Sequence, residues 1–476
     1  MVMLNALGLL FHLVSGGILV FFFLINSFYL LFVVLSLVGL FRYQRMTSYV
    51  RMKEIFSLPL AKPISIIAPA YNEGPNIIES VRSLLALEYP LFEVIVVNDG
   101  STDSTLDKLI QAYDLKKVYR VFRKSVESAP IHGIYMSRQE PKLVVVDKAN
   151  GKKADAMNAG LNIARYPLFC AIDADSILDR DALLKAVRPF HEDPERTVGV
   201  GGIIRVSNGC VIKNGQVHRV KMPRNLLARF QVLEYVRAFF GGRMGMSMMN
   251  SLLIISGAFG VFRKDIALKV GGYRSGAIGE DIDLVIRLRR YLHDHKIPYR
   301  ITFIPDPVCW TEGPESLKVL SGQRNRWHRG LTEVLILYRK MIFNPRYGMT
   351  GMLALPFYLI FEMMGPFVEL LGYVMFTYFV ATGQINSPFA VRFFLLAVVY
   401  GMILSLSALL IEEFSLQRYP RLSDVVTMAA VGILENIVYR QWLVVVRVKA
   451  FFDLIGGNKG WGTMEKKGFT LEHEQP

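Results

Sequence analysis

The sequence predicts an α/β domain with a central, mostly parallel β-sheet, flanked at both ends of the chain by α-helical membrane and interfacial segments. Three observations lead to this fold class. The 476 residues are 52% hydrophobic and only 20% charged, which indicates that part of the chain lies in lipid. Long apolar stretches gather near the two ends. Between them, short apolar runs alternate with helical patterns, which is typical of a parallel sheet covered by helices.

The first membrane segment lies within Ala6–Phe41, which contains no Lys, Arg, Asp or Glu. This run exceeds the roughly 18 residues that mark a candidate span, and no positive charge precedes it, which argues against a cleaved signal peptide. As one helix it would be about 54 Å long. Either one helix from about Gly16 to Phe41 spans the membrane after an interfacial lead-in, which we favour, or two short helices form a hairpin. Because basic residues follow the run, the downstream side is expected to be cytoplasmic.

Three further apolar stretches follow near the C-terminus. Gly351–Ala381 carries two prolines and is expected to be a kinked span, and Val391–Ile411 is expected to return inward. Val425–Val448 contains Glu435, Asn436 and Arg440, each of which is costly at a bilayer centre. We therefore predict that this last stretch is an interfacial or re-entrant helix.

These segments divide the chain into four parts. Residues 1–61 form an N-terminal membrane anchor and linker, and residues 62–345 form a cytosolic domain that ends in an interfacial helix. Residues 346–448 form a C-terminal membrane region, and residues 449–476 form a cytosolic tail. The expected location is the inner (cytoplasmic) membrane, in several passes, with the central domain facing the cytoplasm.

The net charge and the cysteine content limit the kinds of ligand and partner that the protein is expected to bind. The net charge is +15, from 55 Lys and Arg against 40 Asp and Glu, and much of the excess flanks the apolar segments. This arrangement suits membrane lipid and phosphate-bearing substrates, and no nucleic-acid motif is present, so no nucleic-acid partner is expected. Cys170, Cys210 and Cys309 lack the spacing of a zinc site or a disulfide framework, so buried, reduced thiols are predicted.

The central domain contains four short runs of β-branched or apolar residues, with helical patterns between them. In a parallel sheet of this kind, ligands bind beyond the carboxyl ends of the strands. The predicted strands are Ile64–Ala70, Glu93–Asn98, Leu143–Val146 and Leu168–Asp173, and the predicted helices include Asn76–Leu87, Lys153–Ala164 and Asp181–Phe190.

Carboxylates follow three of these strands. Glu73 follows the first and Asp99 the second, where they are able to bond a ribose or a base, although Asp99 with Gly100 is also typical of a simple turn. Asp173 and Asp175 follow Leu168–Ile172, and their charge needs a counterion, which a divalent metal bridging to a diphosphate supplies. Because alternate strand residues point in opposite directions, only Asp175 is expected to touch metal unless the strand ends between the two.

Three further motifs carry candidate site residues. Lys152 and Lys153 open a helix, which makes an anion site or, alternatively, a solvated basic turn. The stretch Gly257–Gly260 follows an apolar run read as a strand, and its glycines let a ligand approach the backbone. Glu280 and Asp281 begin another helix. Asp281 there is either a general base or merely a favourable charge at a helix N-terminus, worth about 0.3–1 kcal/mol.

The stretch Gln323–Trp327 stands where the central domain meets the C-terminal membrane region. Arg and Trp at a membrane surface ordinarily anchor a protein among headgroups. The carboxylates upstream favour a second hypothesis, in which this stretch binds an acceptor at the entrance to the membrane. The following helix, Leu331–Ile342, is then expected to lie along the membrane surface.

Taken in order, these motifs resemble the family-2 glycosyltransferases, and specifically the membrane-bound synthases that make cellulose, chitin, hyaluronan and poly-N-acetylglucosamine. The resemblance spans about Lys62 to Gly330 and implies a GT-A fold. Glu280-Asp281 is followed by Ile282-Asp283-Leu284, closer to the poly-N-acetylglucosamine type, whereas Ser125–Pro141 and the basic stretch Lys213–Arg224 have no clear family counterpart. The resemblance rests on Asp99, Asp173-Ala174-Asp175, Glu280-Asp281 and Gln323-x-x-Arg326-Trp327.

The resemblance implies a donor site for a UDP-sugar. Asp99 would contact the uridine with Glu73 nearby, and Lys153 would lie near the diphosphate. Asp173 belongs to the same site, and Asp175 would hold Mg²⁺ or Mn²⁺ against the diphosphate.

It also implies a reaction centre and an acceptor site. Asp281, with Glu280 beside it, would deprotonate the acceptor hydroxyl as it attacks the anomeric carbon. The diphosphate and acceptor would be bound by Gln323, Arg326 and Trp327, with Gly257 and Phe259 in the same group.

The implied function is inverting, metal-dependent transfer of a sugar from a UDP-sugar to the growing end of a β-linked polysaccharide, with delivery across the membrane. Two alternatives stay open: transfer of a single sugar to a lipid-linked acceptor, and a nucleotide-binding membrane transporter or sensor that is no enzyme. Because only three or four membrane segments are expected, a secretion channel would require a homo-oligomer or an accessory subunit.

Overall fold

The computed structural model describes residues 2–48, 61–213, 215–382, 387–416 and 422–457. The predicted boundary at residue 61 follows a stretch outside the described residues, so the linker is not placed. Most of the predicted cytosolic tail also lies outside them. The described part of that tail continues helix α17 (Arg440–Ile455), which runs past the predicted boundary at residue 448.

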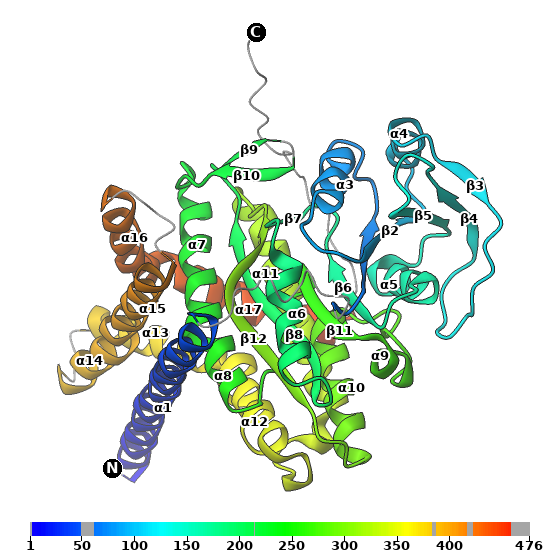
Figure 1. The fold of residues 1–476 in the computed structure, drawn as a ribbon. Coiled ribbons are helices and arrows are strands. Elements are labelled where there is room, and N and C mark those ends of the chain that lie inside the picture. The colour runs from blue at the N-terminus through cyan, green and yellow to red at the C-terminus, as the bar shows by residue number, and fades with distance from the viewer. Residues whose placement is uncertain (1, 49–60, 214, 383–386, 417–421, 458–476) are drawn as a thin grey trace.

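A ten-stranded sheet forms the centre of the domain, with the strand order β3-β4-β5-β2-β1-β6-β11-β8-β12-β7 (Figure 1). A separate hairpin is made of β9 (Val211–Lys213) and β10 (Gln216–Arg219), and it overlaps the basic stretch Lys213–Arg224 that had no family counterpart. The strands of the large sheet are β1 (Ile64–Ala70), β2 (Phe92–Asp99), β3 (Lys116–Val118), β4 (Ile131–Met136), β5 (Leu143–Lys148), β6 (Leu168–Ile172), β7 (Ile177–Leu178), β8 (Thr197–Val206), β11 (Phe259–Arg263) and β12 (Arg300–Thr311).

The four predicted strands are β1, β2, β5 and β6, and they lie side by side and parallel. They are buried along almost their whole length, as continuous apolar runs require when helices cover both faces of a sheet. The expected α/β fold class is therefore confirmed. The connecting helices are α3 (Ile77–Leu85), α4 (Thr105–Ala112), α5 (Lys152–Ile163), α6 (Ala182–Glu192), α9 (Lys264–Lys269) and α10 (Glu280–Asp294).

One predicted strand is wrong. The apolar run before Gly257 is not a strand, and the strand of this region, β11, begins only at Phe259. It runs antiparallel to β6, with Phe259 opposite Ile172. Because β11 is antiparallel to β6, it begins beside the last residue of β6. Gly257, which precedes β11, therefore still lies near the carboxyl end of β6.

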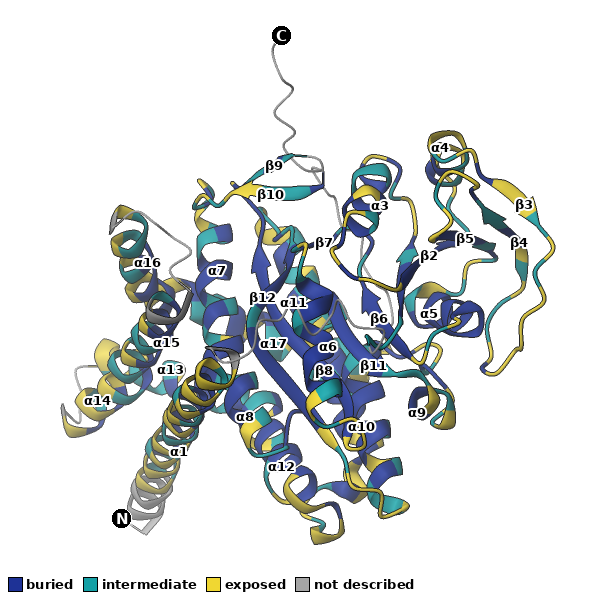
Figure 2. Ribbon diagram, in the orientation of Figure 1, coloured by how far each residue is buried: buried dark blue, intermediate teal, exposed yellow. Residues whose placement is uncertain are grey.

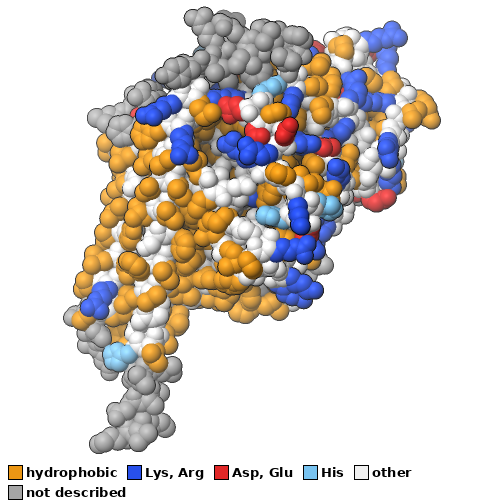
Figure 3. All heavy atoms as spheres, turned by 60° about the horizontal axis from the view of Figure 1, so that its bottom comes forward, with side chains coloured by type: hydrophobic (Ala, Val, Ile, Leu, Met, Phe, Trp, Pro, Cys, Tyr) orange, Lys and Arg blue, Asp and Glu red, His pale blue; other side chains and the backbone are white. Residues whose placement is uncertain are grey.

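Four helical stretches are long and apolar enough to span a membrane: Phe11–Met46, Thr350–Thr382, Pro388–Glu413 and Ser423–Ile455. The first belongs to α1 (Val2–Ser48), a single helix that projects from the body of the molecule, so the favoured single helix is confirmed over the hairpin (Figure 1). Much of its outer surface is exposed in Figure 2, including Phe23 and Phe41. Hydrophobic side chains cover the elongated part of the face in Figure 3, while Lys and Arg gather over the opposite part.

The second stretch is irregular, as its two prolines predict. Two π-helical turns, Thr350–Ala354 and Tyr358–Met363, flank α12 (Leu355–Phe357), and a bend at Met364 precedes α13 (Gly365–Thr382). Proline removes a helical hydrogen bond and crowds the preceding turn, which explains an interruption beside each proline.

The fourth stretch comprises α16 (Leu422–Leu434), a π-helical turn and α17, and its charged residues are paired. Arg237 binds Glu435 at 2.7 Å, and Arg440 binds Glu369 of α13 at 3.2 Å. Pairing removes much of the cost of these charges in lipid. The stretch packs against α7 (Leu226–Ala238) and α11 (Leu317–Leu337) of the central domain and against α13. Because it is also one of the four stretches long and apolar enough to span a membrane, the interfacial or re-entrant helix and its orientation stay predictions.

Candidate active site

The loops that follow β1 and β2 are joined by hydrogen bonds. The Asn72 N–H donates to Ser101 Oγ at 3.0 Å, and the Thr102 N–H donates to Asn72 Oδ1 at 2.9 Å. Asn72 adopts φ +54°, a left-handed conformation that asparagine tolerates well. The next residue, Glu73, is half-buried, and its N–H donates to Thr105 Oγ1 at 3.0 Å. This rim therefore holds Glu73 beside the end of β2.

Asp99 ends β2 and is buried, with an exposed fraction of 3%. Its Oδ1 lies 2.5 Å from Lys148 Nζ and accepts a hydrogen bond from the Gly151 N–H at 3.0 Å. Lys148, at the end of β5, is fully buried and also lies 2.7 Å from Asp155 Oδ1. Sequence analysis missed Lys148 and Asp155, although a lysine that continues an apolar strand is a usable signal.

Lys153 brings together three motifs that are far apart in the sequence. Its Nζ lies 2.5 Å from Asp173 Oδ1, 3.1 Å from Glu280 Oε1 and 3.5 Å from the Gly257 carbonyl oxygen. Burial by itself lowers the pKa of Lys153, but the two carboxylates outweigh it and raise that pKa above its usual value. The ammonium group is therefore charged and links α5, β6 and α10 at one edge of the sheet.

The two carboxylates after β6 are both half-buried. The strand ends at Ile172, before either of them, so strand alternation does not force them apart as the sequence argument assumed. Burial raises the pKa of Asp173, the charge of Asp175 raises it further, and Lys153 opposes both. A cation placed here would relieve that repulsion.

The residues fit a divalent cation only in part. Carboxylate oxygens are the ligands that Mg²⁺ and Mn²⁺ prefer. Among the described residues, however, no group of three or more His, Cys, Asp or Glu is arranged to hold a metal. Asp173 and Asp175 would therefore supply two of the ligands, and the remainder would come from a bound diphosphate and water.

Asp281 lies in the first turn of α10, after the N-cap residue Gly279. Its Oδ2 accepts a hydrogen bond from the Gly257 N–H at 3.2 Å, and its Oδ1 accepts one from the Ile282 N–H at 2.8 Å. The carboxylate is half-buried and is held at the start of β11, next to the cluster around Lys153. Backbone donors thus fix its direction without neutralising its charge.

The stretch Gln323–Trp327 lies inside α11, and the helix predicted for Leu331–Ile342 is only its second half, which ends at Leu337. Trp327 is 44% exposed and packs against the Arg324 guanidinium, whose carbon lies 4.2 Å from the ring centroid. Arg324 is buried, donates to Gln323 Oε1 at 2.8 Å and pairs with Glu234 at 2.7 Å. Sequence analysis missed Arg324, which orders Gln323 and Trp327, while Arg326 is half-buried on the same helix.

The two glycine contacts explain how the helices approach each other. A Cβ at Gly330 of α11 would lie 2.9 Å from the Gly279 nitrogen, so the start of α10 rests directly on α11. A Cβ at Gly257 would lie 2.6 Å from Lys153 Nζ. The sequence indicated Gly257 but gave no reason to single out Gly330.

One residue predicted for the acceptor site does not support that role. Phe259 has an exposed fraction of 0% and lies in β11, between β6 and β8. Phe259 is the first residue of β11, and its ring packs in the core of the sheet, where an acceptor sugar could not reach it. The three cysteines are buried and free, as predicted.

Comparison with known proteins supports a single family. The family described as "Glycosyl transferase family 2" matches residues 65–271. The poly-beta-1,6-N-acetyl-D-glucosamine synthases of Staphylococcus epidermidis (strain RP62A) and Staphylococcus aureus (strain COL) are each 29% identical to the chain, over 273 and 274 residues. In each case the match covers 57% of this chain and 55% of the relative, so the chain matches about half the length of these curated relatives.

Two solved structures are also similar. A mannosyltransferase from Pyrobaculum calidifontis in complex with GDP-Man and Mn²⁺ has 16% identity and a TM-score of 0.47, covering 91% of this chain and 99% of its own. Staphylococcus aureus TarS 1-349 in complex with UDP-GlcNAc has 14% identity and a TM-score of 0.38, covering 80% and 92%. Residues 65–271, which include most of the α/β sheet, are therefore a family-2 glycosyltransferase domain, and the chain is similar over about half of its length to the two synthases.

Proposed function

We propose that the protein transfers a sugar from a UDP-sugar to the growing end of a β-linked polysaccharide, with inversion at the anomeric carbon. One observation carries this proposal: the Lys153, Asp173 and Glu280 cluster lies beside Asp281 at the end of β6, and α11, the helix that carries Trp327, contacts the start of α10 through Gly330. A cation for a diphosphate, a carboxylate for proton transfer and an aromatic platform for a sugar are the parts that this reaction needs.

The proposed reaction is a single displacement. The acceptor hydroxyl oxygen attacks the anomeric carbon, its proton passes to Asp281, and the bond to the diphosphate breaks so that UDP leaves. Lys153 binds the departing diphosphate, and Asp99 and Glu73 bind the uridine. Trp327 offers the terminal sugar a rigid apolar face, and Gln323 and Arg326 complete the acceptor site.

A divalent ion is part of the proposal. Asp175, with Asp173 beside it, would hold Mg²⁺ or Mn²⁺, which would stabilise the negative charge that develops on the diphosphate. Excess chelator is expected to abolish transfer, and added Mg²⁺ or Mn²⁺ to restore it. Full activity in chelator would remove the metal from the proposal.

The donor we propose is UDP-N-acetylglucosamine, because both sequence relatives are named as poly-beta-1,6-N-acetyl-D-glucosamine synthases. The catalytic domain faces the cytoplasm, where the donor is available, and the polymer leaves through the membrane region. Polar groups support this route: Tyr29 of α1 donates to Glu362, and Arg447 of α17 lies 3.6 Å from the same carboxylate. Polar side chains inside membrane segments ordinarily serve a substrate path.

The proposed function is tested on the full-length chain in lipid nanodiscs, with a panel of UDP-sugars and either Mg²⁺ or Mn²⁺. Transfer from UDP-N-acetylglucosamine into a polymer that a linkage-specific hydrolase digests is the expected result. A product that is only a lipid-linked monosaccharide would establish the single-transfer alternative. Binding of UDP without turnover of any donor would establish a transporter or sensor instead.

Gly257→Ala is expected to reduce transfer by roughly 10-fold to 100-fold while leaving the fold intact. The new methyl group would meet Lys153 Nζ, which has to swing away from Asp173. Since displacements of about 1 Å cost about 100-fold in rate, a large loss is reasonable. Steady-state kinetics and a thermal melt check both parts. Gly322→Ala, where a Cβ meets nothing within 4 Å, is the control and should be silent.

Trp327→Ala is expected to slow polymer elongation by up to ~10-fold more than it slows hydrolysis of the donor. The exposed ring would contact the acceptor sugar and not the donor, and stacking on an aromatic ring contributes about 0.5–1.5 kcal/mol. Polymer incorporation and UDP release, measured in parallel, give the ratio. Equal slowing of both rates would place Trp327 outside the acceptor site, and Trp327→Phe should keep most of the activity.

A further inference from the structure

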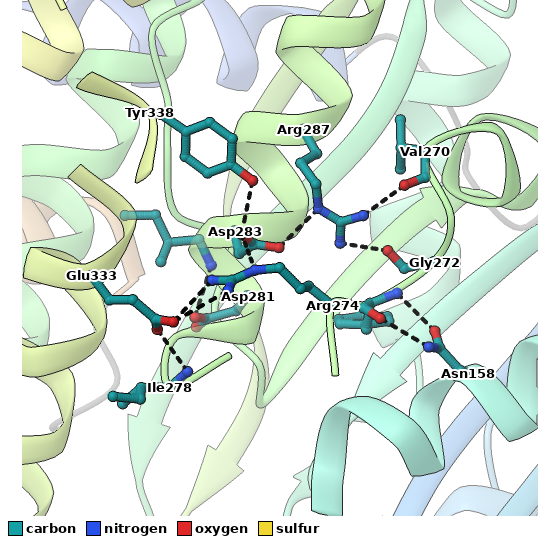
Figure 4. Close-up of polar contacts among 12 residues, drawn as sticks. Asn158, Val270, Gly272, Arg274, Ile278, Asp281, Asp283, Arg287, Glu333 and Tyr338 are labelled. Atoms are coloured by element: carbon teal, nitrogen blue, oxygen red, sulfur yellow. Dashed lines mark hydrogen bonds and ion pairs between the residues drawn. The ribbon is translucent and has the colours of Figure 1, made fainter. Parts of the chain in front are cut away.

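The segment that carries Asp281 is tied to the helix that carries Trp327 by a group of ion pairs around the buried Asp283. Two members of this group, Arg274 and Glu333, belong to no motif of the family resemblance. Asp283, two residues after Asp281, is fully buried. Its Oδ1 accepts from Arg274 Nε at 3.0 Å and from the Tyr338 hydroxyl at 2.9 Å, and its Oδ2 accepts from Arg287 Nε at 2.8 Å. Figure 4 shows the Asp283 carboxylate enclosed by these three side chains.

The group fixes the loop that leads into α10. Arg287 donates to the Val270 carbonyl at 2.6 Å and to the Gly272 carbonyl at 2.5 Å (Figure 4). Gly272 adopts φ +67°, so the loop turns sharply where the arginine holds it. The loop is thus bound to the helix that it precedes.

Arg274 extends the group to α11. Both of its Nη atoms lie 3.2 Å from Glu333 Oε1, and Glu333 Oε2 accepts a hydrogen bond from the Ile278 N–H at 3.0 Å. One carboxylate on α11 therefore holds the loop at two points, four residues apart, just before Asp281. Glu333 lies six positions after Trp327 on the same helix, a rise of about 9 Å.

Charge and burial suit a rigid connection. Two arginines face two carboxylates, so the group is neutral, and Asp283 is satisfied by three donors. Asp283 is the fully buried centre of the network, and a buried carboxylate whose oxygens are all paired is costly to displace. Arg274 and Glu333 lie nearer the surface, with side chains 32% and 24% exposed. Next to this network, the backbones of Gly279 and Gly330 are in direct contact, so α10 and α11 cannot move closer together there.

We propose that Arg274 and Glu333 are positioning residues that hold the acceptor helix α11 at a fixed distance from Asp281. This inference rests on the proposed function, in which Asp281 takes the proton of a sugar bound over Trp327. Loss of the connection would let the acceptor drift from the base while the donor site, built on β1, β2 and β6, stays intact. The acceptor step would suffer and nucleotide binding would not.

Two conservative variants of the full-length protein in nanodiscs test the proposal. Arg274→Lys keeps a charge beside Asp283 but lacks the fork that reaches Glu333, and Glu333→Gln removes the other charge while leaving Asp283 fully paired. Each is expected to lower kcat for elongation on the order of 100-fold, the loss that a misplacement of about 1 Å causes. The KM for the donor, the Kd for UDP and the rate of donor hydrolysis should change by less than about twofold, since the donor site is not touched.

The double variant adds a second criterion. If both residues act through one contact, the kcat of the double variant should lie within about twofold of the kcat of the slower single variant. The reason is that the effects of two residues in direct contact are not additive. Arg290→Lys is the matched control, since Arg290 lies on α10 in an exposed pair with Asp294 at 3.6 Å, and it should have no effect. If Arg274→Lys does not fold, Glu333→Gln decides the question.

Three results would overturn the positioning role: unchanged elongation in both variants, equal losses of elongation and hydrolysis, or multiplicative losses in the double variant. If the protein without any substitution transfers no sugar from any UDP donor, the proposed function is wrong, and the positioning role falls with it. An active unchanged protein with unaffected variants overturns the positioning role alone.

Discussion

Replacing Asp281 with asparagine is expected to lower sugar transfer by roughly 10²-fold to 10⁴-fold, the contribution that a positioned general base makes to a reaction. The amide oxygen can still accept the hydrogen bond that the Gly257 N–H now donates to the carboxylate at 3.2 Å, so the local geometry should persist. The variant loses only the ability to take a proton. Titration with UDP by calorimetry should give an unchanged Kd, because the proposed nucleotide contacts come from other loops.

The competing explanation for Asp281 is a favourable charge at the N-terminus of α10. That role predicts a loss of about 0.3–1 kcal/mol of stability and almost no change in rate. Asp294→Asn, at the opposite end of the same helix, is the matched control and should keep its turnover. If Asp281→Asn retains at least a tenth of the original rate with normal kinetics, Asp281 is not the base and Glu280 becomes the carboxylate to test.

The four central strands could be predicted because each is an apolar run with a polar end. β1, β2, β5 and β6 are buried on both faces, so their sequences are continuously apolar and end sharply. The polar residues just beyond those ends are visible for the same reason. Glu73, Asp99 and Asp173 were found in this way.

Two long strands gave no such signal. β8 contains three glycines, and β12 contains Pro305 and Pro307, residues that ordinarily weaken or exclude a strand. The pairing of β12 with β8 shifts register on both sides of Pro307, so the prolines are accommodated by irregularities in the ladder. The periodicity of the β12 sequence cannot predict these register shifts, because they depend on how β8 pairs with it.

The interactions that join distant motifs were the least predictable part of the site. Lys153 was read as a phosphate ligand, and its ion pairs with Asp173 and Glu280 bring together two carboxylates that are more than a hundred positions apart in the sequence. Buried ion pairs carry no periodicity, because each partner alone looks like a solvated surface residue. The pair of Arg324 and Glu234 was missed for this reason as well.

Lys148→Met is expected to have the largest effect on stability. Lys148 is fully buried between Asp99 at 2.5 Å and Asp155 at 2.7 Å, and its removal would leave two carboxylates without their cation. Breaking a buried pair by removing one partner costs roughly 3–5 kcal/mol. At about 2–4 °C per kcal/mol for a domain of this size, the melting temperature should fall by roughly 10 °C. Thermal unfolding in nanodiscs, followed by tryptophan fluorescence, measures the shift.

The second variant separates an electrostatic cause from lost packing. Adding Asp99→Asn to Lys148→Met removes one of the two uncompensated charges, so the double variant should melt above the single one. A methionine that merely packs badly would give no such recovery, and the double variant would then be the less stable of the two. Lys116→Met, on the exposed edge strand β3, should change stability by no more than about 0.5 kcal/mol. Because Asp99 is also the proposed uridine contact, Lys148→Met should weaken UDP binding, whereas Lys116→Met should leave it unchanged.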